Sequence, residues 1–191
     1  MKELPIKCAI FDMDGTVLDS SYVWSGDDAT LESVKPIYAS TVFDAKPGIP
    51  RFLASLKEHG VKTAIATGNL IENAENALVN AGLRGYFDGI YSPESVGGIK
   101  KAEPVLFTKI AADFGCLPEE AVVFEDAMHN LRSAIRGGFG TIGVYDEPSA
   151  DREAEMIELV DIQIRSYDEL EVTSKDGVPT VRTARNSCRR S

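Results

Sequence analysis

Short apolar runs rich in β-branched residues alternate along the chain with segments whose apolar positions recur every three or four residues. The first pattern is typical of buried strands and the second of amphipathic helices. Their alternation predicts an α/β fold, a three-layer, Rossmann-like parallel sheet flanked by helices. Strands are expected at residues 7–12, 62–67, 89–92, 121–125 and 140–145, with a sixth at the edge near 161–165.

The predicted helices lie between these strands, and most of them end at a glycine. Apolar residues share one face before Gly60, Gly82, Gly115 and Gly137, and a last helix includes Met156. Glycine directly after a helix is a common stop, because it adopts the left-handed conformation without steric cost. The order of the elements is therefore that of a doubly wound sheet.

Two segments depart from this pattern. Residues 20–46 are polar and mixed, and they form a short insert after the first strand. Residues 171–191 lack apolar periodicity and carry five basic residues against two acidic ones. We expect residues 1–170 to form the folded core domain, with 20–46 as its insert, and residues 171–191 to be a disordered basic tail.

Composition narrows the class of protein. The chain has 191 residues, enough for one full domain, and its net charge is −10. So acidic a chain is a poor candidate for binding nucleic acid through phosphate contacts. The three cysteines are widely spaced and form no C-x-x-C pair, which indicates reduced thiols rather than disulfides or a zinc site. No apolar run has the length of a signal peptide or a membrane span, so we expect a cytoplasmic protein with no membrane or nucleic-acid partner.

Polar side chains follow three of the predicted strands. Asp12 and Asp14 follow the first, Thr67-Gly68-Asn69 follow the second, and Glu125 and Asp126 end the fourth. The carboxyl ends of parallel strands meet at one edge of a sheet, so these groups are expected to converge on one crevice. Carboxylates suit Mg²⁺, which prefers oxygen ligands. A hydroxyl and the N–H groups at a helix start suit a phosphate, and the set as a whole indicates phosphoryl transfer.

The stretch Asp12-Met13-Asp14-Gly15 has two simpler interpretations. A calcium-binding loop needs glycine at its sixth position and glutamate at its twelfth, whereas here glycine is fourth and Val23 is twelfth. A plain surface turn is compatible with the stretch in isolation. The acids at the end of the fourth strand are what favour a reactive site.

Four stretches of the chain resemble the ordered motifs of the haloacid dehalogenase superfamily. They read "FDMDGT", "IATGN", "KAEPVLF" and "VVFEDAMHNLRSAI", and each lies at a strand end or a helix start. The resemblance is to the phosphatase and β-phosphoglucomutase-like branch, and it extends over residues 7–170. It implies a hydrolase that cleaves the phosphate ester of a small metabolite through an aspartyl-phosphate, with Mg²⁺ as cofactor.

The resemblance assigns a role to each strand-end residue. Asp12 would be the nucleophile, and Asp14 would protonate the leaving oxygen and then activate water. Thr67-Gly68-Asn69 would hold the phosphoryl group, and Lys101 would brace both the nucleophile and the phosphate. For the metal, Asp126 would bind Mg²⁺ together with Asp12 and the carbonyl of Asp14, and Glu125 would act nearby or through water.

The chain departs from the family pattern at the third motif and at the cap. The third motif usually reads Lys-Pro-x-Pro-Asp, and here it keeps the lysine and the second proline. Lys101 stands three residues before Pro104, and Lys100 remains open as an alternative. The helical cap that usually closes over the substrate is reduced to residues 20–46. This implies a large substrate, a lid supplied by a second copy or another partner, or a deletion that impairs activity.

Three other functions remain to be weighed against the phosphatase. A phosphorylated receiver domain needs its aspartate after the third strand, where this chain has Ser92-Pro93-Glu94. For a family member that has become a binding module, the short insert counts in favour and the intact Asp12, Asp14, Thr67 and Asp126 count against. A phosphomutase needs cap residues to reorient its intermediate, which the short insert disfavours.

Overall fold

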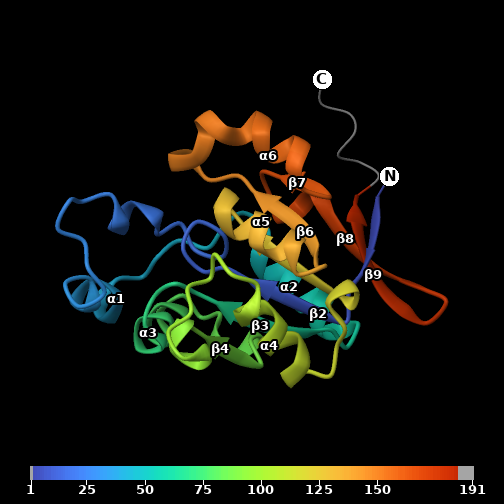
Figure 1. The fold of residues 1–191 in the computed structure, drawn as a ribbon, viewed down its shortest axis with the longest axis horizontal. Coiled ribbons are helices and arrows are strands. Elements are labelled where there is room, and N and C mark those ends of the chain that lie inside the picture. Colours follow the sequence, from blue (N-terminus) through green and yellow to red (C-terminus); the bar gives the residue numbers. More distant parts are fainter. Residues whose placement is uncertain (1, 185–191) are drawn as a thin grey trace.

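The computed structural model describes residues 2–184. At its centre is a six-stranded sheet with the strand order β4-β3-β2-β5-β6-β7 (Figure 1), in which all neighbouring strands are parallel. The strands are β2 (Cys8–Phe11), β3 (Lys62–Ala66), β4 (Gly89–Tyr91), β5 (Ala121–Glu125), β6 (Gly140–Val144) and β7 (Ile162–Ile164). Each lies within a range predicted from the sequence, and the predicted α/β class is confirmed. The chain runs outward from β2 to β4 and then returns to β5, so the switch point lies between β2 and β5.

Helices cover both faces of this sheet. α2 and α3 pack on the face that carries Ala9 and Phe11 of β2, and α4 and α5 pack on the face that carries Cys8 and Ile10. This alternation along one strand is the period of two that a sheet buried on both sides requires. Figure 1 shows α4 and α5 in front of the sheet and α2 behind it. The helices are α1 (Lys35–Ser40), α2 (Ile49–Glu58), α3 (Ile71–Asn80), α4 (Val105–Asp113), α5 (Met128–Arg136) and α6 (Glu153–Leu159).

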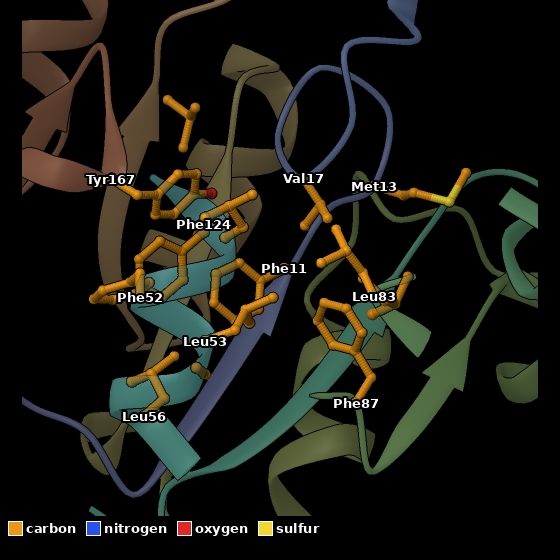
Figure 2. Packing of buried hydrophobic residues seen from close by; sticks show 14 of the residues in the cluster. Phe11, Met13, Val17, Phe52, Leu53, Leu56, Leu83, Phe87, Phe124 and Tyr167 are labelled. Atoms are coloured by element: carbon orange, nitrogen blue, oxygen red, sulfur yellow. The ribbon is translucent and has the colours of Figure 1, made fainter. Parts of the chain in front are cut away.

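An aromatic cluster fixes the two strands that border the switch point (Figure 2). The rings of Phe11 on β2 and Phe124 on β5 stack with centroids 4.3 Å apart, and Phe52 of α2 meets both edge-on or nearly so. Tyr167 closes the cluster on the side of α2. Such pairs contribute roughly 0.5–1.5 kcal/mol each beyond the area they bury. Asp12 comes directly after β2 and Glu125 ends β5, so a rigid part of the core positions both side chains.

The insert after β2 packs against α3 rather than over the sheet. It holds a 3₁₀ helix at Ser21–Trp24 and the short helix α1, which lies at the left edge of Figure 1 beside α3. Tyr38 of α1 is fully buried, and the side-chain amide of Asn80 on α3 donates to the carbonyls of Tyr38 and Thr41. The part of the insert that contains α1 is thus packed into the folded core.

The expected disordered tail is wrong for residues 171–183. This segment forms a hairpin of β8 (Leu170–Lys175) and β9 (Val178–Thr183), and β9 pairs with the N-terminal strand β1 (Glu3–Pro5) in a second, antiparallel sheet (Figure 1). The physical reason is the Asp176-Gly177 pair between the two strands. Both residues have positive φ, at 52° and 80°, which is what a two-residue hairpin turn requires.

The basic residues of this hairpin face acids. The guanidinium of Arg182 pairs with Glu171 across the hairpin and with Glu3 on β1, and Lys175 also pairs with Glu3. Exposed pairs of this kind add little stability individually, and they engage two of the five basic residues of the segment 171–191. Arg185, Arg189, Arg190 and Cys188 lie outside the described residues. Across residues 2–184, none of the helices has the length and apolar character needed to cross a bilayer.

Candidate active site

Asp12 and Asp14 lie in the loop that follows β2 at the switch point. The backbone N–H of Asp12 donates to the carbonyl of Phe124, 2.9 Å away, so the loop begins in register with β5. Gly15 then turns the chain with φ of 86°. A Cβ at this position would lie 2.5 Å from Oγ of Ser21 and 2.9 Å from Cγ of Asp126. Only glycine can make this turn, because both the backbone angle and the space exclude a side chain.

Lys101 lies between the acids at the ends of β2 and β5. Its ammonium pairs with Oδ1 of Asp12, lies 2.7 Å from Oε2 of Glu125 and donates to the carbonyl of Ala66 at 2.7 Å. The side chain is 5% exposed. Burial opposes its charge, but the carboxylates of Asp12 and Glu125 outweigh burial and hold the pKa of Lys101 above its ordinary value. Lys100, the alternative left open by the sequence, is exposed and lies at the rim of the cavity described below.

Three carboxylates gather at this point. Oxygen atoms of Asp12, Glu125 and Asp126 all lie within 4.8 Å of one another. Burial and the charge of Glu125 raise the pKa of Asp12 to about 7, against the opposing effect of Lys101. Burial, Glu125 and Asp12 also raise the pKa of Asp126 well above its ordinary value. The cluster thus carries more negative charge than one lysine neutralises, which favours binding of a cation.

The oxygen atoms of this cluster differ in what they contact. Oε1 of Glu125 accepts from the side chain of Asn130 and the N–H of Ala127, and its Oε2 faces Lys101. Oδ1 of Asp126 accepts from the hydroxyl of Thr16 at 3.0 Å. Hard oxygen donors at this spacing fit a small divalent cation. Both oxygens of Glu125 thus contact protein groups, Oε1 through hydrogen bonds and Oε2 through the ion pair with Lys101.

Asp14 is held by residues of the insert. Its Oδ1 accepts from the hydroxyl of Ser20 at 2.5 Å and from the hydroxyl of Tyr38 at 2.5 Å. The indole N–H of Trp24 in turn donates to the Tyr38 hydroxyl at 3.0 Å. Burial and the charge of Asp12 raise the pKa of Asp14 to about 6, although these hydrogen bonds act in the opposite direction. The pKa of Asp14 therefore lies close to neutrality.

The segment Thr67-Gly68-Asn69 leads from β3 into α3. Thr67 is 1% exposed, and its hydroxyl accepts from the N–H of Asn69 at 3.0 Å. Oδ1 of Asn69 accepts from the N–H of Leu70 and from the side chain of Asn73, each at 2.8 Å. Within residues 2–184, Nδ2 of Asn69 is buried without a hydrogen-bond partner. Gly68 and Asn69 line the cavity, so donors are available there for an anionic ligand.

These groups open into one cavity of about 830 Å³. Asp12, Asp14, Lys101, Glu125 and Asp126 all line it. This volume lies in the range typical of small-molecule sites. The remainder of the wall comes from the insert, the loop before α4 and the start of α5, with Trp24, Leu31, Pro93, Lys100 and His129 among its residues.

Sequence reasoning missed several residues around the site. Asp146, in the turn after β6, is 2% exposed; its carboxylate pairs with Lys46 and accepts from the hydroxyl of Ser21 at 2.6 Å. Ser20 and Tyr38, which contact Asp14, were missed as well. Lys46 and Ser21 lie at the two ends of the insert, so Asp146 ties both ends to the sheet. The one available signal was the position of Asp146 directly after a predicted strand.

Comparisons with known proteins agree with the motifs. A family model described as haloacid dehalogenase-like hydrolase matches residues 22–138. The fructose-1-phosphate phosphatase YqaB of Escherichia coli (strain K12) is 32% identical over 106 residues, which are 55% of this chain and 56% of that protein. The phosphonoacetaldehyde hydrolase of Bacillus cereus is 25% identical over 179 residues, which are 93% of this chain and 64% of that protein. The chain thus spans about half to two thirds of the length of these curated relatives.

The fold is also found among solved structures. A crystal structure of CbbY from Rhodobacter sphaeroides in complex with phosphate superposes with a TM-score of 0.72 at 21% sequence identity. The match covers 85% of this chain and 95% of that one. At this identity the likeness shows the fold alone.

Proposed function

Because the chain belongs to the haloacid dehalogenase-like hydrolases, we propose that it hydrolyses phosphate monoesters of small metabolites, with Asp12 as the nucleophile. The observation that carries this proposal is the placement of Lys101 against Asp12, in the same cavity as Asp14. An ionised carboxylate beside a buried ammonium suits attack on an anionic phosphoryl group. The names of relatives such as the fructose-1-phosphate phosphatase support the substrate class.

The proposed reaction has two steps. In the first, a carboxylate oxygen of Asp12 bonds to phosphorus, the ester P–O bond breaks, and Asp14 gives its proton to the departing oxygen. In the second, Asp14 takes a proton from water, the water oxygen bonds to phosphorus, and the aspartyl P–O bond breaks to release inorganic phosphate. The pKa of Asp14, about 6, suits a group that must both donate and accept a proton near neutral pH.

In this proposal, four donors bind the phosphoryl group. Lys101 supplies a charge and Gly68 its backbone N–H at the cavity wall, and Asn69 offers its buried side-chain N–H. The fourth is the hydroxyl of Thr67, which is buried directly before Gly68. Such donors hold the phosphoryl oxygens while phosphorus changes its bonding. Lys101 is preferred over Lys100 because it is the lysine that contacts Asp12.

We further propose Mg²⁺ as the cofactor, held by Asp12, Asp126 and the backbone carbonyl of Asp14. Glu125, whose oxygens already contact Lys101 and Asn130, would act next to the ion rather than as a direct ligand. The cluster fits a cation because burial and mutual repulsion raise the pKa of its acids. When bound, Mg²⁺ neutralises phosphate charge and favours the ionised form of Asp12.

The proposal is tested by phosphate release from a panel of phosphomonoesters, with Mg²⁺ and with EDTA. Asp12→Asn should abolish turnover, and wild type trapped with substrate should gain the mass of one phosphoryl group on Asp12. Asp19→Asn is the matched control, because its side chain is 65% exposed. Turnover that survives Asp12→Asn overturns the nucleophile assignment. Absence of turnover by wild type on every ester favours a binding module instead.

A further inference from the structure

Three residues of the insert form hydrogen bonds that converge on Asp14: Trp24 and Tyr38 as a chain, and Ser20 directly. Trp24 lies in the 3₁₀ helix, Tyr38 lies in α1, and Ser20 precedes both. The distances are 3.0 Å from the indole nitrogen to the phenol oxygen and 2.5 Å from that oxygen to Oδ1 of Asp14. Ser20 reaches the same Oδ1 at 2.5 Å. The insert thus contacts one oxygen of Asp14 twice.

The direction of each hydrogen bond follows from the groups themselves. An indole N–H can only donate, so the phenol oxygen of Tyr38 accepts from Trp24. The phenol hydrogen is then directed at Asp14, since a carboxylate oxygen is the acceptor. With two hydroxyl hydrogens directed at Oδ1, a proton on Asp14 is best carried by Oδ2.

Tyr38 is itself firmly held. Its side chain is fully buried, and its ring lies 5.2 Å from that of Phe43. Asn80 of α3 holds the backbone at Tyr38 and just after it, through the carbonyls of Tyr38 and Thr41. Trp24 lines the cavity as well as contacting Tyr38, so the chain of bonds runs from the cavity wall to Asp14.

From this arrangement we propose that Tyr38, oriented by Trp24, is a positioning residue that fixes Asp14 through Oδ1 and leaves Oδ2 to deliver the proton. The inference rests on the proposed function, because it assumes that Asp14 protonates the leaving oxygen. It assigns to the short insert the task of orienting the proton donor. No closing lid is needed for that task.

A purely structural role for the Tyr38 hydroxyl makes a different prediction. A buried phenol commonly finds a hydrogen-bond partner for packing reasons alone. Loss of such a bond would lower stability and slow all substrates alike. Loss of a positioned proton donor slows only those esters whose leaving oxygen needs a proton.

The test compares an aryl ester with alkyl esters. The aryl ester is 4-nitrophenyl phosphate, whose phenolate leaves without a proton. The alkyl esters are fructose 1-phosphate, phosphoglycolate and glycerol 1-phosphate, whose alkoxides require one. Tyr38→Phe should lower kcat on the fastest alkyl ester by roughly 10–100-fold, part of the ~10²–10⁴-fold that a positioned acid contributes. Turnover of the aryl ester and KM for the alkyl ester should change little.

Two further variants sharpen the comparison. Trp24→Phe should show the same preference for the aryl ester, to a smaller degree, because the hydroxyl of Tyr38 remains. In the Tyr38→Phe background, Trp24→Phe should add little further loss, since the two act through one chain of bonds. Tyr86→Phe is the matched control, because Tyr86 precedes β4 at the opposite end of the sheet. Thermal unfolding of each variant reports on folding separately.

The outcomes separate this inference from the proposed function. Equal losses on aryl and alkyl esters, or no loss on either, overturn the positioning role while the phosphatase proposal stands. Additive effects of Trp24→Phe and Tyr38→Phe also contradict it. Wild type that hydrolyses the aryl ester but none of the alkyl esters has no working proton donor, which refutes the inference. Wild type without activity on any ester overturns both proposals.

Discussion

The ammonium of Lys101 lies 2.7 Å from Oε2 of Glu125, and both side chains are almost completely buried, at 5% and 1% exposure. The same ammonium pairs with Asp12 on the other side. Lys101 therefore joins the strand ends of β2 and β5 across the switch point. A buried cation between two carboxylates stabilises both of them, and in the proposed reaction it also faces the phosphoryl group, so its removal should affect both stability and turnover.

Lys101→Met is expected to lower kcat by about 10²–10³-fold, the usual effect of removing one charge-stabilising donor from a reactive site. It should also lower the free energy of unfolding by roughly 3–5 kcal/mol near pH 8, because the acids lose a buried partner. Steady-state kinetics and urea denaturation measure the two effects. Lys100→Met provides the comparison, since Lys100 is exposed. If Lys100→Met were the more damaging of the two, the choice of Lys101 would be wrong.

The metal-free protein should become less stable as pH rises from about 4 to about 7. The pKa of Asp12 is raised to about 7 and that of Asp14 to about 6, whereas in the unfolded chain both lie near ~4. The folded state thus binds more protons across this window, so its free energy of unfolding falls with increasing pH and levels off above pH ~7. His129, whose pKa is lowered by burial, acts in the opposite direction. So do Glu120 and Glu155 at the acid end of the window, because hydrogen bonds from basic side chains lower their pKa.

Asp14→Asn tests how much one acid contributes to this pH dependence of stability. The variant should be more stable than wild type at pH 8, by about 1–2 kcal/mol, and the difference should shrink toward pH 5. Urea denaturation in EDTA at both values of pH gives the comparison. Asp151→Asn, at an exposed position, should leave the slope unchanged. A stability that rises from pH 5 to pH 8 in wild type would contradict the raised pKa values.

Mg²⁺ should raise the melting temperature of the protein, because an ion that binds only the folded state stabilises it by about 2.7 kcal/mol at one hundred times its dissociation constant. Binding should tighten between pH 6 and pH 8, since the acids must release protons to bind the ion. Calorimetry in two buffers of different ionisation enthalpy counts these protons. Asp126→Asn should remove both effects and Asp113→Asn neither. A melting temperature insensitive to Mg²⁺ would count against the metal site.

The strand ends were predictable from the sequence for a physical reason. Each buried strand is a continuous apolar run, so the first polar residue after it marks the edge of the sheet. That argument located Asp12 and Glu125. It could not locate Tyr38, which lies 24 positions from its partner Asp14 in an insert without apolar periodicity. Contacts made by a segment of that kind depend on tertiary packing.

The hairpin was missed because its charge pattern was given more weight than its turn. Asp176-Gly177 is a strong hairpin signal, and Val172 and Val181 on either side are both buried. The basic residues were interpreted as a disordered tail, although Arg182 pairs with Glu3 and Glu171 on the adjacent strands. The apolar residues on both sides of the Asp-Gly pair predict the hairpin better than the charge predicts a tail.

Gly177→Ala tests the hairpin directly. Gly177 has φ of 80°, where an L-residue with a side chain costs roughly 1–2 kcal/mol. The variant should lose about that much stability in urea denaturation. Gly26→Ala is the matched control, because a Cβ there would meet nothing within 4 Å and the backbone is not left-handed. Equal stability of the two variants would show that the turn is not formed as described.

Lys46→Met addresses the attachment of the insert. Lys46 pairs with Asp146, and their side chains are 11% and 1% exposed. Without the lysine, the carboxylate of Asp146 keeps the neutral hydroxyl of Ser21 as its side-chain partner among residues 2–184. An uncompensated buried charge costs roughly 3–5 kcal/mol, so Lys46→Met should be strongly destabilising. Asp146→Asn in the same chain should restore part of the loss, because it removes the charge and keeps a hydrogen-bonding oxygen for Ser21. Urea denaturation of both single variants and the double variant measures the coupling, and strictly additive losses would mean that the pair does not hold the insert.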